Sequence, residues 1–276
     1  MKTVDVEMHL NGTWQTICQV EFIGNQKIIH STNKFAYTQQ HQTTYYADIS
    51  SKACSVNYPV TFDIYSEDKL LGFIDDIIPA GAARRKWLEI DEIKQADDLE
   101  FALLTHGAIS PVGNLRIKSA VEKLNSNLIT QYFPIEDVIN RDSDFLSYAH
   151  ERGALTGGAT GAGGEAPKLL LRVNDNNQVW IDCFQNANLP DKAYLVKFPR
   201  GARTDIDKDI LRAEYSYYQV LSRAGYNTID ILNMKLEEGV NMPSLWLPRF
   251  DLKFDDGHEV HYGLESILSA IQGSSG

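Results

Sequence analysis

The chain has little cysteine and lacks the cysteine pairs that bind metals. Its three cysteines, Cys18, Cys54 and Cys183, are far apart, and no C-x-x-C occurs among the 276 residues. A disulfide framework needs an even set of cysteines, and a zinc site needs closely spaced ligands. The cysteine content therefore excludes a small disulfide-rich domain and a zinc finger. It predicts a protein of the reducing cytoplasm.

Positive charge and long apolar runs are also scarce. The chain carries 26 basic and 37 acidic residues, a formal net charge of -11. Such a chain is not drawn to nucleic acid by charge alone, so we expect any DNA contact to be indirect, through a partner. No stretch approaches the roughly 20 apolar residues of a membrane span, and the N-terminus lacks the apolar region of a secretion signal. We therefore expect no membrane contact.

Glycine, by contrast, is concentrated in one stretch. Five glycines lie between Gly157 and Gly164, and the apolar run Leu169–Leu171 follows shortly after. Glycine has no side chain, so backbone N–H groups in such a loop can face an anion closely. The short apolar run predicts a buried strand. Two interpretations stay open at this point: a loop that covers phosphates, and a flexible linker between two domains.

The residues around the glycines exclude two common phosphate-binding motifs. Lys168 is followed by Leu169, so the Walker pattern G-x-x-x-x-G-K-[S/T] fails. Residues 161–166 spell G-x-G-x-x-A, but no strand clearly precedes them and no helix follows, as a dinucleotide-binding fold requires. A glycine loop beside a strand, with a lysine on a later strand, is the arrangement of protein kinases.

Patterns of apolar residues predict an α+β protein. Residues 1–47 predict a small antiparallel sheet, with a hairpin turn at Asn11-Gly12. Helical spacing and end signals then predict helices at 66–79, 82–95, 99–106 and 135–150, with a short strand at 115–117. After the glycines, we expect strands at 169–171, 179–184, 193–198, 229–239 and 242–252, a helix from 205 to Gly225, and a helix at 262–271.

Two charged residues sit on faces that are otherwise apolar. Lys197 shares its strand face with Leu195, because side chains alternate along a strand. It is either a rim residue or a buried cation with an anionic partner. Glu214 lies on or beside the apolar stripe of the next helix. It can pair with Lys197, as in a kinase nucleotide site, or on the surface with Arg212 or Arg223.

Six segments in order make the chain resemble the HipA family, bacterial serine/threonine kinases that act as toxins in toxin–antitoxin pairs. The segments are FIDDIIP, GAISPVGNLRI, GATGAGGEAPKLLL, YLVKFP, RAEYSYYQVLSRAG and PRFD, from about Phe73 to Asp251. The resemblance implies a β-rich N-terminal subdomain with helices at residues 1–150. It implies a kinase-like N-lobe, built on an antiparallel sheet, at 151–276. The helical C-lobe of the family is apparently absent, as in a truncated chain.

The resemblance also implies a nucleotide site that binds ATP. The residues that match the family's nucleotide-binding positions are Gly161, Ala162, Gly163, Gly164, Lys197, Glu214, Arg249 and Phe250. Thr160 matches the hydroxyl residue that the family autophosphorylates to switch itself off. The chain departs from the family at Pro248, where a glutamate is usual; proline keeps a backbone carbonyl acceptor on the adenine side but lacks the carboxylate.

No catalytic residue is identified by the resemblance. The family carries a G-x-x-D-x-H-x-x-N loop and a later aspartate for Mg²⁺, and residues 252–276 contain neither. We expect the chain alone to transfer phosphate very poorly or not at all, as a fragment or as half of a split kinase completed by a second chain. A HipB-like helix-turn-helix antitoxin is the implied partner. The alternatives are a non-catalytic module that binds an antitoxin-like partner, and an unrelated α/β protein with a glycine linker. His258 and His261 predict no metal site, since no third ligand accompanies them.

Overall fold

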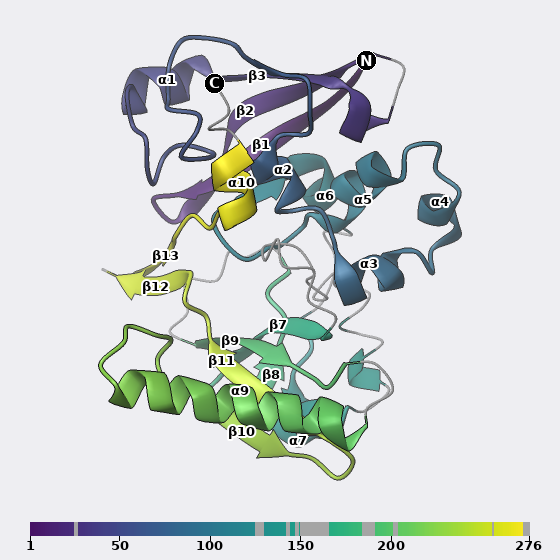
Figure 1. Ribbon diagram of the computed structural model, residues 1–276, viewed down its shortest axis with the longest axis vertical. Helices are drawn as coiled ribbons and strands as arrows, with labels where there is room; N and C mark the ends of the chain where they lie inside the picture. The colour runs from purple at the N-terminus through teal and green to yellow at the C-terminus, as the bar shows by residue number, and fades with distance from the viewer. Residues whose placement is uncertain are drawn as a thin grey trace.

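The computed structural model describes residues 1–24, 27–124, 130–141, 144–146, 149, 166–183, 191–200, 204–255 and 257–272. These residues form two antiparallel sheets, one above the other in Figure 1, with helices beside each. The α+β class predicted from the sequence is confirmed. Among the predicted site residues, Thr160, Gly161, Ala162, Gly163 and Gly164 lie outside the described residues.

The first sheet has the order β4-β3-β2-β1-β5. Its strands are β1 (Lys2–Leu10), β2 (Thr13–Ile23), β3 (Thr32–Tyr37), β4 (Tyr65–Glu67) and β5 (Leu115–Ile117). Asn11 and Gly12 join β1 to β2 with φ of 50° and 78°, the left-handed conformations that a two-residue hairpin turn requires. The predicted hairpin and the strand at 115–117 are therefore confirmed.

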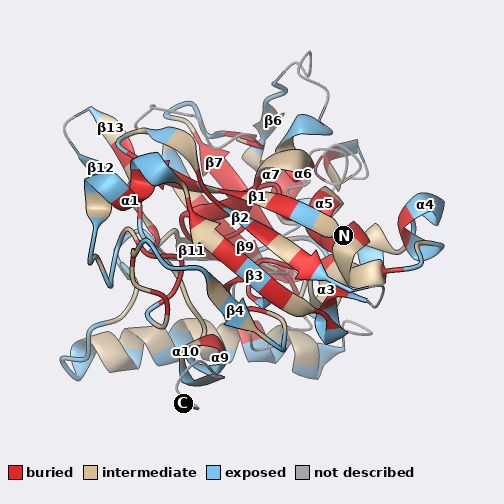
Figure 2. Ribbon diagram, turned by 90° about the horizontal axis from the view of Figure 1, so that it is seen from above, coloured by how far each residue is buried: buried red, intermediate tan, exposed pale blue. Residues whose placement is uncertain are grey.

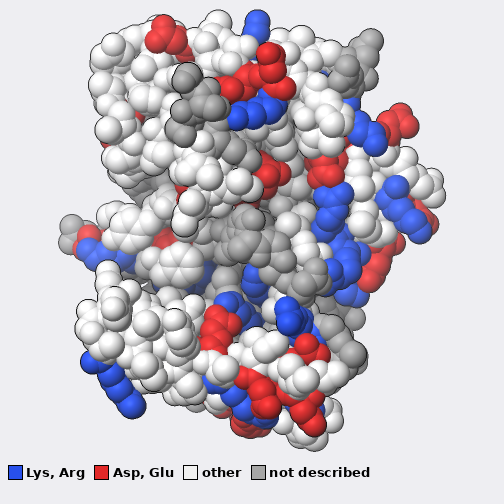
Figure 3. All heavy atoms as spheres, in the orientation of Figure 1, with Lys and Arg blue, Asp and Glu red and all other residues white. Residues whose placement is uncertain are grey.

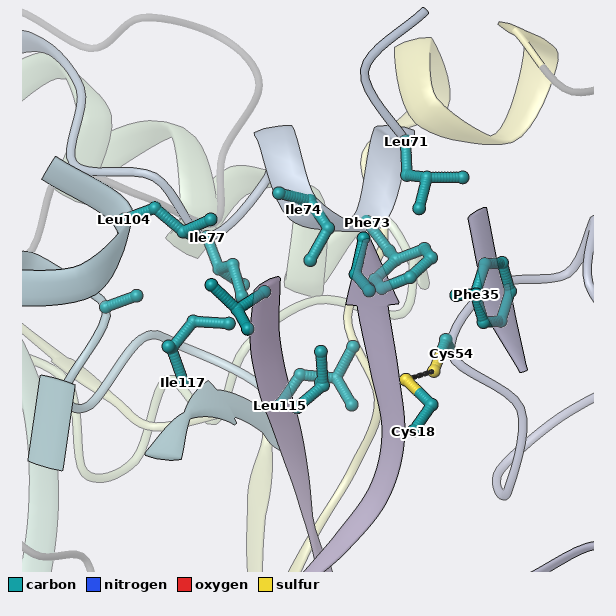
Figure 4. Packing of buried hydrophobic residues seen from close by; sticks show 14 of the residues in the cluster. Cys18, Phe35, Cys54, Leu71, Phe73, Ile74, Ile77, Leu104, Leu115 and Ile117 are labelled. Atoms are coloured by element: carbon teal, nitrogen blue, oxygen red, sulfur yellow. Dashed lines mark hydrogen bonds between the residues drawn. The ribbon is translucent and has the colours of Figure 1, made fainter. Parts of the chain in front are cut away.

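Short helices cover this sheet and complete its core. They are η1 (Ile28–His30), α1 (Gln39–Tyr45), α2 (Gly72–Asp75), α3 (Gly81–Trp87), α4 (Asp91–Lys94), α5 (Leu99–Gly107) and α6 (Lys118–Glu122). Figure 4 shows Leu71, Phe73, Ile74 and Leu104 from this layer around the buried core of the sheet. Of the helix predicted at 66–79, only Gly72–Asp75 is helical, as α2, and residues 65–67 pair with β3 as a strand. The helix predicted at 82–95 is divided at Ile90, whose backbone is extended.

The second sheet has the order β10-β11-β9-β7-β8-β6. Its strands are β6 (Phe133–Pro134), β7 (Lys168–Val173), β8 (Gln178–Trp180), β9 (Lys192–Lys197), β10 (Lys235–Glu238) and β11 (Pro243–Pro248). The long helix α9 (Asp205–Arg223) packs against this sheet, and Thr204 and Asp207 cap its first turn reciprocally. Figure 2 shows strands β7, β9 and β11 largely buried, while α9 remains half-exposed. The helix predicted at 135–150 is interrupted after α7 (Ile135–Asn140), because Arg141 turns left-handed with φ of 57°; residues 144–146 and 149 are helical again.

The last described residues return to the first sheet. The hairpin β12 (Leu252–Asp255) and β13 (His258–His261) contacts β1, and α10 (Ile267–Gln272) packs beside α2. The Glu265 carboxylate accepts hydrogen bonds from the Ser55 hydroxyl and the Val56 N–H, at 2.6 and 3.0 Å. The domain boundary predicted at residue 150 stays a prediction. In the structure, β6 belongs to the second sheet, and residues 252–272 lie beside the first sheet. In the described part of the chain, no helix is long and apolar enough to cross a membrane.

Candidate functional site

A cleft of about 410 Å³ opens between the second sheet and α9. Its floor comes from β7, β9 and β11, and its wall from one face of α9. The lining residues are Ala166, Lys168, Leu195, Lys197, Phe198, Arg200, Asp207, Ile210, Leu211, Glu214, Tyr218, Ile229, Leu247 and Phe250. Cations therefore lie near one end of the β7–β9 pair, and aliphatic and aromatic side chains line the rest. Ala166 is the first described residue after the glycine stretch in the sequence, and it lines the cleft.

Lys197 and Glu214 form an ion pair inside the cleft. The Lys197 Nζ lies 2.5 Å from Glu214 Oε1, and the two side chains are 19% and 27% exposed. The capping box fixes the first residue of α9. The apolar stripe of α9 packs on the sheet, and Glu214, which lies beside that stripe, therefore faces the sheet. Of the two pairings that the sequence left open for Glu214, this is the one with Lys197. The surface alternative is wrong for Arg212, because that guanidinium binds Glu238 and Asp209 instead.

Lys168 is a third charged residue of the cleft, and the sequence analysis did not select it. It lies directly opposite Lys197 in the pairing of β7 with β9, so both side chains point to the same face. Burial, followed by the nearby charge of Lys197, lowers the pKa of Lys168. No residue that the structure describes forms a hydrogen bond or ion pair with its ammonium. Among the described residues that line the cleft, three cations (Lys168, Lys197 and Arg200) stand against two carboxylates (Asp207 and Glu214), which leaves one excess positive charge.

Phe250 lines the cleft, whereas the Arg249 side chain turns away from it. The Arg249 guanidinium binds Asp251, with Nε 2.6 Å from Oδ1, and both side chains are buried. Asp251 in turn accepts a hydrogen bond of 2.7 Å from the Gly113 N–H. The structure thus brings Lys197, Glu214 and Phe250 together around one cleft. The Arg249 side chain instead lies at the junction between the two sheets, where it binds Asp251.

The junction between the two sheets contains a second cluster of charges, in which Arg172, Glu259 and His261 are buried and Asp182 is nearly so. Arg172 of β7 donates to Glu259 of β13 at 2.8 Å and lies 3.2 Å from Asp182. Glu259 also bonds His261 Nε2 at 2.8 Å, and the His261 ring lies over His9 with centroids 3.9 Å apart. Bonds from His261 and Arg172 hold the pKa of Glu259 at about 2, although burial alone would raise it.

The described residues offer no site for a metal ion. No group of three or more His, Cys, Asp or Glu in this part of the chain has metal-binding geometry. His261 is committed to Glu259 in the buried cluster. Within the cleft, Asp207 caps α9 through Thr204, and Glu214 binds Lys197.

Comparisons with known proteins identify the fold. No family model and no curated protein matches the sequence. A solved chain from Shewanella oneidensis MR-1 does match, in a complex described as the toxin–antitoxin system HipA, HipB and its operator DNA. The match has a TM-score of 0.57 at 16% sequence identity, and it covers 94% of this chain and 54% of the solved chain. This chain therefore has a HipA-like fold and spans about half the length of the solved chain.

Proposed function

We propose that the cleft binds ATP and that the chain carries the nucleotide-binding lobe of a HipA-type serine/threonine protein kinase. The observation that carries this proposal is the paired Lys168 and Lys197, with Glu214 of α9 bound to Lys197. A strand lysine held by a helix glutamate binds nucleotide phosphates in protein kinases. The chemistry of the cleft suits ATP, with cations for the phosphates and the apolar Leu247 and Phe250 for the base.

ATP, when bound, would supply the phosphoryl group for transfer to a protein hydroxyl. Lys168 and Lys197 would hold and neutralise phosphate oxygens, and Glu214 would orient Lys197. The described residues do not fit Mg²⁺, so we assign them no metal ligand and no transfer step. A non-catalytic binding module is the second candidate for this reason.

Intact mass after incubation with Mg-ATP separates the kinase from the binding module. A gained phosphate, mapped to Thr160 or elsewhere, supports a kinase, and no gain supports the module.

The partner that we propose is a HipB-like helix-turn-helix protein. The solved neighbour is described as part of a complex with HipB and operator DNA. This chain carries a formal net charge of -11, so it would contact DNA through that partner rather than by its own charge.

Titration with ATP tests the proposed cleft. Replacing Lys197 with alanine removes a charge-assisted contact, so we expect ATP affinity to fall about tenfold to a hundredfold. Lys192→Ala is the matched control, because Lys192 is an exposed lysine at the opposite end of the same strand. We expect it to bind ATP as wild type does. Equal affinities of wild type and a folded Lys197→Ala variant would overturn the proposal.

A further inference from the structure

Two cysteine thiols meet in the core of the first sheet, far from the cleft. Cys18 lies on β2 and Cys54 on the segment between α1 and β4, and their sulfur atoms are 3.7 Å apart (Figure 4). A disulfide has a sulfur–sulfur distance of about 2.05 Å, so a shift of under about 2 Å would close the bond. Both residues are free thiols in the structure.

The two thiols differ in access from solvent. Cys54 lines a surface pocket of about 300 Å³, together with Ser55, Asn114 and Glu265. Cys18 does not line that pocket, and it is 0% exposed, against 5% for Cys54. A small oxidant can therefore reach Cys54 first, with Cys18 directly behind it.

Hydrogen bonds hold Cys54 in this position. Its N–H donates to the Tyr37 hydroxyl at 2.9 Å, and that hydroxyl donates to the Tyr58 carbonyl at 2.7 Å. Tyr37 also lies opposite Cys18 in the pairing of β2 with β3. Burial, and then the hydrogen bond to Cys54, raise the pKa of Cys18. Cys54 lines the surface pocket and Cys18 is fully buried behind it, so the two cysteines have different roles in the oxidation proposed next.

We propose that Cys54 is a peroxide-reactive cysteine and that Cys18 resolves it to a reversible disulfide. The Cys54 sulfur attacks one oxygen of hydrogen peroxide, the O–O bond breaks, and water leaves, which gives a sulfenic acid. The Cys18 sulfur then attacks the Cys54 sulfur. The S–O bond breaks, the S–S bond forms, and the oxygen leaves as water with the Cys18 proton. Two thiols are oxidised and one peroxide is reduced, consistent with a transient cytosolic disulfide.

The disulfide would tighten the segment that holds α10. Ser55 and Val56, the residues after Cys54, donate hydrogen bonds to Glu265. Asn57 donates to the Ala270 carbonyl at 2.9 Å. Fixing Cys54 to β2 removes freedom from this segment, so oxidation should slow amide hydrogen exchange in residues 53–57 and in α10.

Peptide mapping of the peroxide-treated chain tests the proposal. After brief treatment of the folded protein, we expect the intact mass to fall by two hydrogen atoms. A non-reduced digest should contain one peptide that joins Cys18 to Cys54 and disappears with dithiothreitol. Cys183→Ser is the matched control, because Cys183 is buried in the core of the second sheet, and it should give the same linked peptide.

A second variant tests the order of events. In Cys18→Ser, the sulfenic acid has no resolving thiol, so dimedone should label Cys54 at least several-fold more than in wild type. A linked peptide that contains Cys183, or no linkage in wild type and in Cys183→Ser, would overturn the proposal. The linkage measurements use wild type and Cys183→Ser, whose first core is unaltered, so they do not depend on the folding of the Cys18 variant.

Discussion

One face of strand β7 has a cation at each end, and the two cations have opposite surroundings. Lys168 and Arg172 are four residues apart, with Leu170 between them on the same face. Arg172 is buried and bound by Asp182 and Glu259. Lys168 faces the open cleft beside Lys197, where Glu214 ion-pairs with Lys197 and Asp207 ion-pairs with Arg200, and no described carboxylate ion-pairs with Lys168. A cation balanced by buried carboxylates fixes the structure, whereas cations in excess beside an open cleft can bind an anion.

The balanced end of β7 joins the two sheets. Glu259 connects Arg172 of the second sheet to His261, whose ring packs on His9 of the first. At the open end, no described residue makes such a connection to the first sheet. The two ends should therefore respond differently to mutation: changes at Arg172 should affect stability, and changes at Lys168 should affect ligand binding.

Arg172→Met should have the largest effect on stability. The variant leaves Glu259 and Asp182 buried without their cation, which costs about 3–5 kcal/mol of the free energy of unfolding. Urea unfolding measures the change. Arg223→Met is the control, because Arg223 is exposed at the end of α9, and it should unfold as wild type does. A loss of less than about 1 kcal/mol in Arg172→Met would contradict a structural role for this cluster.

Acid should weaken the same junction. The pKa of His9 is lowered from 6.5 to about 3, by burial first and then by the nearby His261. Below pH 6.5, His9 binds a proton in the unfolded chain but stays neutral in the folded chain. The free energy of unfolding therefore falls between pH 6.5 and about 3. Glu259 adds to the loss between its ordinary pKa of 4.5 and its folded value of about 2.

Urea unfolding at several pH values measures this acid effect. Wild type should lose stability steadily as the pH falls below 6.5. His9→Gln should show a smaller loss between pH 6.5 and 4.5, since glutamine does not titrate there. Identical pH dependence in the variant and in wild type would show that His9 is not the group responsible.

The sequence was sufficient to predict part of the cleft. Alternation along a strand and the apolar stripe of a helix placed Lys197 and Glu214 on facing surfaces, and the structure confirms their pairing. Lys168 was considered only within the Walker pattern. Its role depends on the register of β7 with β9, which pairs it with Lys197, and a local pattern does not reveal that register.

The junction could not be predicted for the same reason. The sequence analysis predicted no strand at residues 253–261, and the structure places them in the hairpin β12–β13. Glu259 and His261 are buried because that hairpin lies against β1, a contact between residues far apart in the chain. The periodicity of apolar residues along a strand or helix shows which residues share a face, but it does not show which other element covers that face.

Lys168 should set the pH dependence of ATP binding. Its pKa is lowered from 10.5, so its ammonium loses charge at a lower pH than an ordinary lysine. We expect ATP affinity of wild type to fall about tenfold as the pH rises through that lowered pKa. Lys168→Ala should bind ATP more weakly at neutral pH and should lack that part of the decline. A variant that keeps the full decline would assign it to another group.

The smallest effect is expected on the outer face of α9. Arg212 binds Glu238 and Asp209 there, and all three side chains are exposed. Figure 3 shows side chains of both charge signs mixed over this region. Solvent and salt screen such pairs, so Arg212→Ala should leave both the urea midpoint and ATP affinity at wild-type values. A clear shift in either value would mean that the face of α9 opposite the cleft also supports the site.

The most direct test compares ATP with adenosine in wild type and in the double variant Lys168→Ala, Lys197→Ala. Calorimetric titration gives the ratio of the two dissociation constants for each protein. If the two lysines bind phosphates, wild type should prefer ATP by at least about tenfold, and the folded double variant should lose most of that preference. Equal affinity for ATP and adenosine in wild type, or an unchanged ratio in the double variant, would contradict a phosphate-binding cleft at this end of β7.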